Sequence, residues 1–340
     1  MAPSRREFFQ GCLAVGAAAL GGLSFMRDRS AWAREPQSNN APEPGYLELE
    51  RNGELERRER ALRAMLEDCR LCPRECGANR VVGEVGACSS ADTFKVASYS
   101  PHFGEERPLV GKRGSGTIFF SNCNLLCVFC QNWTINHRGD GRETSPAELA
   151  DIMLALQRGG CHNINLVTPT HLVPHLVSAL RLAIAEGLHL PLLYNSSGYD
   201  SLEVIQQLDG VIDIYLPDFK YQDAATAARF SNGAPDYPIH AAAAIREMHR
   251  QVGELKQIGG IAYKGLLIRH LVLPENMEGT DGFVRWVVSG LGPETHVNIM
   301  GQYSPQFRAR EYPPLGRRPT QEEIAQATRW AREAGLRHLH

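Results

Sequence analysis

Three cysteines in the first half of the chain have the spacing of iron–sulfur ligands. Cys123, Cys127 and Cys130 are separated by gaps of three and two residues, so their thiolates can converge on three corners of a four-iron cube. The fourth iron of such a [4Fe-4S] cluster would have no protein ligand, and a small molecule could chelate it. Two alternatives stay open: a zinc site, and a ferredoxin-like cluster whose fourth ligand is the isolated Cys161.

A second set of cysteines lies upstream, at Cys69, Cys72, Cys76 and Cys88. Four thiols on a short, glycine-containing segment could hold a structural zinc ion or a second iron–sulfur cluster, and the spacing does not separate the two. A metal would stabilise a segment that has little apolar core of its own. Two disulfides or four free thiols are the alternatives.

The overall composition is that of a globular protein and excludes some classes of partner. Of 340 residues, 43% are apolar, which is enough to bury a sizeable core. The 36 basic and 38 acidic residues give a net charge of −2, so electrostatics offers no reason to expect nucleic acid as a partner. Nine cysteines are unusual, and their short gaps in so long a chain favour metal ligation over a disulfide framework.

The first 33 residues resemble a twin-arginine export signal. Arg5 and Arg6 lie at the start, an apolar stretch covers residues 12–25, and residues 31–33 (Ala-Trp-Ala) fit a cleavage site. The apolar stretch is short for a membrane-spanning helix, and no later segment is long and apolar enough, so we expect no stable membrane span in the mature chain. These features predict a periplasmic or other extracytoplasmic location, with the cytoplasm as the alternative.

Beyond a linker and charged helix (residues 34–68) and a cysteine-rich segment (residues 69–110), apolar runs alternate with helical patterns. We expect strands at residues 117–121, 163–168, 190–195, 211–216, 265–273 and 296–300. We expect helices at residues 147–158, 172–185, 202–208, 241–252, 283–289 and 321–334. Because the strands are continuously apolar, they are predicted to be buried on both faces of a parallel sheet.

Polar residues lie at or near the carboxyl ends of these strands. They are Thr168, Thr170, Asn195, Ser196, Ser197, Asp218, Lys220, Arg269, His270, Gln302 and Tyr303. An α/β barrel gathers such strand ends around one site. Six strand–helix units are too few for the complete eightfold barrel, so we predict an open, partial TIM-type (β/α)6 barrel over residues 111–340. A doubly wound sheet is the alternative α/β architecture.

Long stretches of the chain resemble the radical S-adenosylmethionine (SAM) superfamily and, more closely, its pyruvate formate-lyase activating enzyme-related (PflX-like) group. The cysteine spacing at residues 123–130 is that of the superfamily. The stretches that resemble the group are residues 72–77 (CPRECG), 114–120 (GSGTIFF), 128–132 (VFCQN), 163–171 (NINLVTPTH), 213–221 (DIYLPDFKY) and 268–274 (IRHLVLP). The resemblance implies a [4Fe-4S] cluster that binds SAM and cleaves it with one electron, giving a 5′-deoxyadenosyl radical that abstracts hydrogen from a substrate.

The resemblance also implies contacts with SAM near the first two strands. Phe129 would place its ring near the adenine, and ordinary core packing is the alternative for this residue. Thr168 and Thr170 follow the second strand, where many members of the superfamily have a Gly-Gly-Glu-Pro stretch that contacts the methionine amine. The glycines and the acid are absent here, so hydroxyls or backbone carbonyls would have to make that contact.

Further SAM contacts are implied at the third and fourth strands. Asn195, Ser196 and Ser197 are similar to a polar segment that meets the ribose or the carboxylate of SAM. Asp218 and Lys220 match an Asp-x-Lys motif, in which Lys could pair with a carboxylate and Asp could hold the ribose. A structural ion pair is the alternative interpretation of these two residues.

The last strands contribute residues with less specific assignments. Arg269 suits carboxylate recognition, because its planar guanidinium can donate two hydrogen bonds. His270 is better explained as an interior histidine. Gln302 and Tyr303 are candidates for substrate contact through their position alone. The sequence assigns no acid–base or nucleophilic catalyst.

The leading functional hypothesis is therefore radical SAM catalysis, supplied with electrons by a flavodoxin- or ferredoxin-like donor. The family name suggests a protein substrate that acquires a glycyl radical, and hydrogen abstraction from a small molecule is the alternative. A non-catalytic electron carrier or metal-binding partner protein is the rival class, but six strands ending in polar residues argue against it. Export from the cytoplasm conflicts with the need of the proposed reaction for SAM and electrons, because both are normally supplied inside the cell.

Overall fold

The computed structural model describes residues 42–340, which belong to one compact unit. The predicted twin-arginine signal and the first residues of the predicted linker and charged-helix segment (residues 34–68) therefore lie outside the described residues. No helix in the described range is both long enough and apolar enough to cross a membrane.

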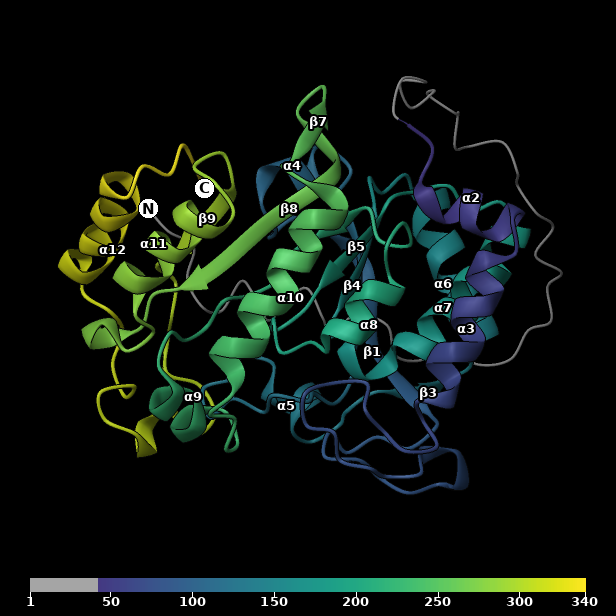
Figure 1. The fold of residues 1–340 in the computed structure, drawn as a ribbon, viewed down its shortest axis with the longest axis horizontal. Helices are drawn as coiled ribbons and strands as arrows, with labels where there is room; N and C mark the ends of the chain where they lie inside the picture. Colours follow the sequence, from purple (N-terminus) through teal and green to yellow (C-terminus); the bar gives the residue numbers. More distant parts are fainter. Residues whose placement is uncertain (1–41) are drawn as a thin grey trace, which may run out of the picture. The chain divides into compact units, whose positions relative to one another are not determined.

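Six parallel strands form the centre of a ten-stranded sheet (Figure 1). They are β2 (Ser115–Phe120), β4 (Ile164–Val167), β5 (Leu192–Asn195), β6 (Ile214–Tyr215), β8 (Ile261–Leu271) and β9 (His296–Met300). These strands are neighbours in chain order, and β10 (His338–Leu339) extends the parallel sheet beyond β9. A doubly wound sheet reverses its strand order at a switch point, whereas this order never reverses. The fold is thus mixed α/β with a mainly parallel sheet, as a partial barrel requires.

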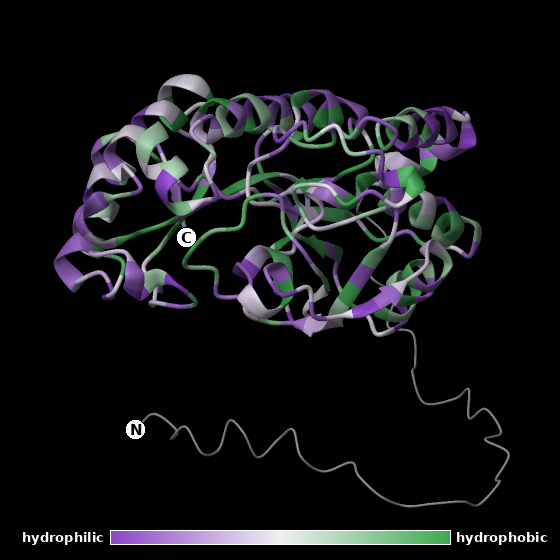
Figure 2. Cartoon of the chain, turned by 90° about the horizontal axis from the view of Figure 1, so that it is seen from below, coloured by the Kyte–Doolittle hydropathy of each residue, from purple (hydrophilic) through white to green (hydrophobic). Residues whose placement is uncertain are grey.

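The helices that connect these strands agree with the predicted alternation. They are α6 (Pro146–Arg158), α7 (Val173–Ala185), α8 (Leu202–Gln207), α10 (Tyr237–Val252), α11 (Thr280–Gly290) and α12 (Gln321–Glu333). Both α6 and α12 begin with a capping box, formed by Ser145 with Glu148 and by Thr320 with Glu323. Helices pack in chain order, α6 with α7, α8 with α10 and α11 with α12. Figure 2 shows hydrophilic residues mainly on the outer turns of these helices.

Three antiparallel strands were missed by the sequence patterns. β1 (Phe94–His102) pairs with β2, from Val96 opposite Phe120 to His102 opposite Ser115, and also with β3 (Arg142–Thr144). β7 (Lys256–Ile258) pairs with β8. Because β1 belongs to the sheet, the sheet crosses the boundary that the sequence placed between residues 110 and 111. Short helices at α4 (Arg107–Val110), α5 (Trp133–Asn136) and α9 (Ala224–Phe230) were not predicted either.

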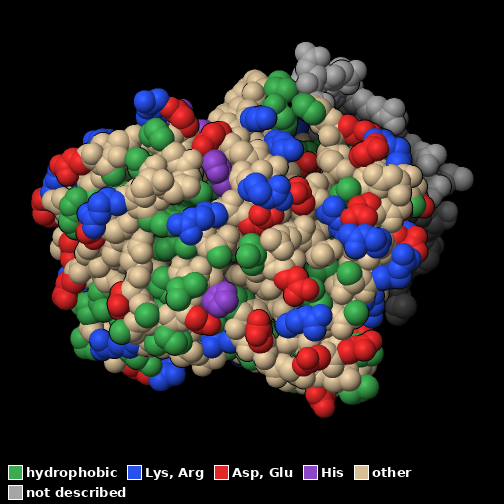
Figure 3. Space-filling model, viewed as in Figure 1, with side chains coloured by type: hydrophobic (Ala, Val, Ile, Leu, Met, Phe, Trp, Pro, Cys, Tyr) green, Lys and Arg blue, Asp and Glu red, His purple; other side chains and the backbone are tan. Residues whose placement is uncertain are grey.

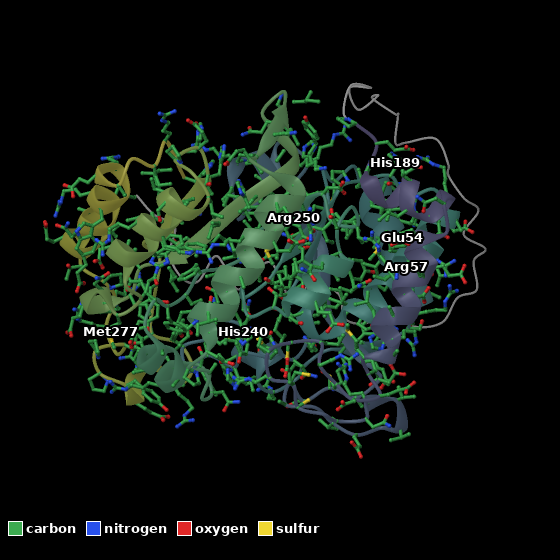
Figure 4. All side chains as sticks on the ribbon, viewed as in Figure 1. Glu54, Arg57, His189, His240, Arg250 and Met277 are labelled. Carbon is green, nitrogen blue, oxygen red and sulfur yellow. The ribbon has the colours of Figure 1, made fainter. Side chains whose placement is uncertain are left out.

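The amino-terminal charged segment differs from the single, solvated helix that was expected. It forms α2 (Gly45–Arg51) and α3 (Glu54–Ala64), which are separated at Gly53, where φ is 78°. Leu55 and Leu62, seven residues apart, lie on one face of α3 and are buried, and α3 packs against α7. Glu54 and Arg57 form an ion pair on the exposed face (Figure 4). Apolar burial therefore fixes this helix on the barrel.

Acidic and basic side chains are mixed over the face seen in Figure 3. This distribution agrees with the small net charge of −2 and gives this face no extended patch of one sign.

Candidate active site

A cavity of about 500 Å³ lies at the carboxyl ends of the parallel strands. Its lining includes residues from or just beyond all six strands: Phe119, Val167, Asn195, Asp218, Arg269 and Asn298. Residues from the first to the last of six neighbouring strands can border one cavity only if the sheet curls. The cavity is thus the place where a partial barrel would gather its functional groups.

The three cysteines after β2 all line this cavity as free thiols. Asn122 and Leu126 adopt left-handed conformations, with φ of 71° and 55°, which fold the loop tightly around Cys123. The backbone N–H of Leu125 donates to Cys123 Sγ over 3.4 Å. Cys127 Sγ lies 3.2 Å from the Ser231 hydroxyl. Donors aimed at sulfur are suited to thiolates that carry a metal cluster.

Protonation of these thiols depends on their surroundings. Burial raises the pKa of Cys123 to about 12, and burial also raises the pKa of Cys130. Without a metal the two thiols therefore retain their protons at neutral pH, and metal binding would release them. Asn136 Nδ2 donates to Cys130 Sγ over 3.4 Å, and the Lys220 ammonium acts to lower the pKa of the same thiol.

Within residues 42–340, no three His, Cys, Asp or Glu side chains are already arranged to hold a metal ion. The chemistry of the loop nevertheless fits a [4Fe-4S] cluster, since three thiols border one cavity and polar donors face their sulfur atoms. Cys123, Cys127 and Cys130 would have to converge when a cluster binds. Cys161, the alternative fourth ligand, is buried elsewhere, beside the start of β4, and does not line the cavity.

A network of charged side chains forms another part of the cavity wall. Asp218 Oδ2 accepts from Lys220 Nζ over 2.6 Å, and Asp218 Oδ1 accepts from Arg269 Nε over 2.9 Å. Arg269 also donates to Asn195 Oδ1 over 2.5 Å and to Glu105 Oε2 over 3.3 Å. Burial alone would raise the pKa of Asp218, but the charges of Arg269 and Lys220 outweigh burial and lower it. Asp218 and Lys220 therefore form a buried ion pair that also borders the cavity.

Glu105 and Glu106 are cavity residues that the sequence analysis missed. They lie between β1 and α4. Glu105 Oε1 accepts from Asn165 Nδ2 over 3.3 Å, and Glu106 Oε1 accepts from Asn298 Nδ2 over 2.8 Å. Neither acid belongs to a local motif, and the strand that delivers them was not predicted. No signal in the sequence identified them.

Phe129 both lines the cavity and packs against other rings. Its ring makes edge contacts with Tyr303 at 5.7 Å and Tyr221 at 6.4 Å between centroids. Tyr303 also lines the cavity and donates its hydroxyl to the Leu315 carbonyl over 2.7 Å. Gln302 borders the same space. Phe129 thus packs against other rings and borders the cavity, and its contact with adenine stays a prediction.

The two threonines after β4 have different surroundings. Thr168 lines the cavity in a left-handed conformation, with φ of 62°, which is unusual for a β-branched residue. Thr170 is buried away from the cavity and donates to Asp200 Oδ1 over 2.6 Å. Asp200 also accepts from the Ser196 hydroxyl over 2.6 Å. The Thr170 hydroxyl is thus occupied by a buried carboxyl, and the predicted contact of this residue with SAM stays a prediction.

The remaining candidates lie as follows. Ser196 and Ser197 both border the cavity. His270 is fully buried, with Nδ1 2.6 Å from the Phe219 carbonyl and Nε2 3.1 Å from the Thr280 hydroxyl. Burial lowers the pKa of His270 to about 4, so it is neutral near pH 7. His270 is therefore an interior histidine with both ring nitrogens satisfied.

The second cysteine set lies outside this cavity. Cys69, Cys72 and Cys88 are buried and Cys76 is exposed, and all four are free thiols. Gly86 lies between two of them, since a Cβ added there would come within 3.2 Å of Cys76 Sγ and 3.8 Å of Cys88 Sγ. The structure thus contains no disulfide at these positions.

Comparison with known proteins identifies the family. Residues 117–259 match the radical SAM superfamily. The chain is similar to uncharacterized protein MJ0674 of Methanocaldococcus jannaschii, with 32% identity over 281 residues that cover 80% of this chain and 76% of that protein. It is also similar to uncharacterized protein MJ0808 of the same organism, with 23% identity and 80% of each chain covered. Superfamily members are enzymes that typically bind a [4Fe-4S] cluster and SAM. By this match and by the cysteine loop that borders a cavity at the strand ends, the chain belongs to the radical SAM superfamily.

Proposed function

We propose that this chain holds a [4Fe-4S] cluster on Cys123, Cys127 and Cys130 and cleaves SAM reductively to a 5′-deoxyadenosyl radical. The observation that carries the proposal is one cavity bordered by all three thiols and by the polar ends of the strands. When bound, the cluster supplies the electron that breaks a carbon–sulfur bond of SAM. The protein's own contribution is to bind, to orient and to keep water away from a reactive centre.

The charged wall of the cavity would perform that orientation. Three of the five N–H donors that a guanidinium carries are occupied in Arg269, by Asp218, Asn195 and Glu105, which leaves two for a ligand. Lys220 forms an ion pair with Asp218 and also interacts electrostatically with Cys127. Its ammonium lines the cavity and could pair with a carboxylate of a ligand bound there.

The finer assignments rest on the resemblance to the PflX-like group. On that basis the substrate is a protein that acquires a glycyl radical, and the electron donor is flavodoxin- or ferredoxin-like. The twin-arginine pattern in residues 1–33 supports an extracytoplasmic location. A metal on Cys69, Cys72, Cys76 and Cys88, either zinc or a second iron–sulfur cluster, is a separate expectation that SAM cleavage does not require.

Anaerobic reconstitution with iron and sulfide tests the proposal. A variant with Cys123, Cys127 and Cys130 all changed to Ala should lose about four irons per chain relative to the wild type and release no 5′-deoxyadenosine under strong reductant. Cys161→Ala is the matched control, because this thiol is buried and lies outside the cavity. It should behave as the wild type.

The same material separates catalysis from the rival function of a non-catalytic electron carrier. SAM should change the electron paramagnetic resonance spectrum of the reduced cluster by binding its open iron. The proposal is wrong if SAM neither changes the spectrum of the wild-type cluster nor is cleaved, under conditions in which an established radical SAM enzyme cleaves it.

A further inference from the structure

Arg80 is a fully buried cation in the cysteine-rich segment, within the 3-10 helix Arg80–Val82. Its guanidinium donates to backbone carbonyls, over 2.7 and 3.0 Å to Ala91 and over 2.8 Å to His171. Carbonyls satisfy its donors but do not neutralise its charge. No carboxylate forms an ion pair with Arg80 anywhere in residues 42–340. A charge removed from water is costly unless an opposite charge compensates it.

The acidic and basic groups around Arg80 do not supply that compensation. Glu84, four residues along the chain, accepts instead from the backbone N–H of Asn79 over 2.7 Å. Asp92 is paired with Arg63 over 3.1 Å and with His175 over 2.8 Å. His171 can contribute no negative charge. Burial, followed by the charge of Arg80, lowers its pKa to about 3, so the ring is neutral.

The ionisable group that does face Arg80 is a thiol. Arg80 Nη1 lies 3.9 Å from Cys69 Sγ, which is within the range of an N–H···S hydrogen bond. Among residues 42–340, the ionisable side chain in contact with the guanidinium is therefore Cys69, which neutralises it as a thiolate.

The local fold brings Cys76 and Cys88 to the same place. The N–H of Cys69 donates to Ala78 and the N–H of Gly77 donates to the Cys69 carbonyl, both over 3.2 Å. This closed loop returns Cys76 toward Cys69. Gly86 leaves room for Cys76 Sγ and Cys88 Sγ, as a side chain there would meet both.

We infer that Cys69, Cys72, Cys76 and Cys88 bind a metal as a tetrathiolate centre, and that Arg80 is its buried counter-ion. Four thiols lose four protons to solvent when the metal binds, so a zinc ion (2+) or a [4Fe-4S] core (2+) on four thiolates carries a net charge of −2. Such an anion compensates Arg80, whereas disulfides or protonated thiols would leave Arg80 alone. The thiols must draw together on binding, because they do not yet have ligand geometry.

The test removes the barrel site first, so that its outcome is independent of the proposed SAM chemistry. The full chain carrying Cys123→Ala, Cys127→Ala and Cys130→Ala is purified and its zinc, iron and sulfide are counted. One zinc per chain, or four irons with sulfide after anaerobic reconstitution, supports the inference and identifies the metal. A folded chain that binds neither would overturn it. Adding Cys72→Ala should abolish the binding, and adding Cys161→Ala should not.

The role of Arg80 is tested in the same background with cobalt(II) as a spectroscopic probe of thiolate ligation. Arg80→Met should weaken cobalt binding, measured by competition with a chelator, by at least about tenfold, and Arg80→Lys should retain part of the affinity. The rise in melting temperature on metal binding should also be smaller in Arg80→Met than in the parent. If affinity and this rise are unchanged in Arg80→Met, then Arg80 serves only to bind the two carbonyls and the counter-ion assignment is wrong.

Discussion

Replacing Asp218 by Asn tests whether the charged wall of the cavity is held by charge or only by shape. Asp218, Lys220, Arg269 and Glu105 expose only 10–17% of their side chains, so solvent screens their interactions weakly. Removing one partner of a buried ion pair typically costs 3–5 kcal/mol. Arg269 would keep its ion pair with Glu105, and the introduced Asn would keep one acceptor oxygen. We therefore expect a loss at the lower end of this range, about 3 kcal/mol of unfolding free energy at pH 7.

The pH dependence of the unfolding free energy provides a second test of this prediction. The pKa of Asp218 is lowered in the folded chain from its usual 3.8, where burial is outweighed by Arg269 and Lys220. A lowered carboxyl pKa stabilises the fold above the unfolded pKa, and the benefit is lost as the pH falls through the folded pKa. Asn does not titrate. The difference in unfolding free energy between wild type and Asp218→Asn should therefore reach its full value at pH 7 and be smaller at pH 3.

Urea unfolding of both proteins at the two pH values measures this difference, provided that the m-values agree. Asp140→Asn is the matched control, since Asp140 pairs with Arg138 on the fully exposed surface and should matter far less. A loss below about 1 kcal/mol at pH 7, or an equal loss at both pH values, would show that hydrogen bonding and shape rather than charge hold the wall.

Three further substitutions test other parts of the structure. Leu62→Ala should cost about 3 kcal/mol of unfolding free energy, because the side chain is fully buried between α3 and the barrel, and Val82→Ala, at an exposed site, should cost little. Thr168→Gly should raise the unfolding free energy by about 0.5–1 kcal/mol, since relief of the left-handed backbone exceeds the entropy of an added glycine; a clear loss would mean that the threonine side chain is needed. Thr170→Val should cost about 1–3 kcal/mol by leaving a buried carboxyl short of a donor, with calorimetry as the measurement, and a neutral effect would contradict the assigned hydrogen bond.

The six parallel strands could be predicted because each contains buried apolar residues; β4, β5 and β6 are almost fully buried, whereas the last three residues of β9 are only partly buried. β1 escaped detection because much of it is exposed and its pattern is irregular, and β3 and β7 contain only three residues each. The cysteine loop was recognisable because its chemistry is local in sequence. Glu105 was not, because its partners Asn165 and Arg269 lie 60 and 164 residues away and only the closed sheet brings them together.

Thr168 and Thr170 show that the sequence pattern also fails to predict the direction of individual side chains. They are two residues apart and of one type, so a strand-end argument treats them alike. The left-handed conformation of Thr168 breaks the strand pattern, and the following residues enter the 3-10 helix Thr170–Leu172. Thr170 then faces the interior, where Asp200 takes its hydroxyl. Side-chain direction beyond a strand end depends on the turn, which the apolar pattern does not encode.

Hydrogen bonds from Arg74 connect the two cysteine sets, and these bonds predict that a change at one site affects the other. Arg74, between Cys72 and Cys76, donates to the Asn124 carbonyl and to the Ser231 carbonyl, each over 3.0 Å. Asn124 lies in the barrel cysteine loop, and the Ser231 hydroxyl contacts Cys127 Sγ. A metal on the upstream set would hold Arg74 in place and thereby stiffen the loop that we propose to bind the cluster.

Cys72→Ala in the otherwise native chain should therefore release barrel-bound iron to a chelator faster than the wild type, by roughly tenfold, as expected when a group that supports metal ligands is lost. Cys161→Ala supplies the control for loss of a buried thiol away from both sets. Anaerobic absorbance at the cluster band follows the release. Arg74→Gln should reproduce part of the effect while the upstream metal remains bound. Equal release rates in Cys72→Ala and wild type would mean that the loop is rigid without its neighbour, and that the Arg74 contacts do not couple the two sites.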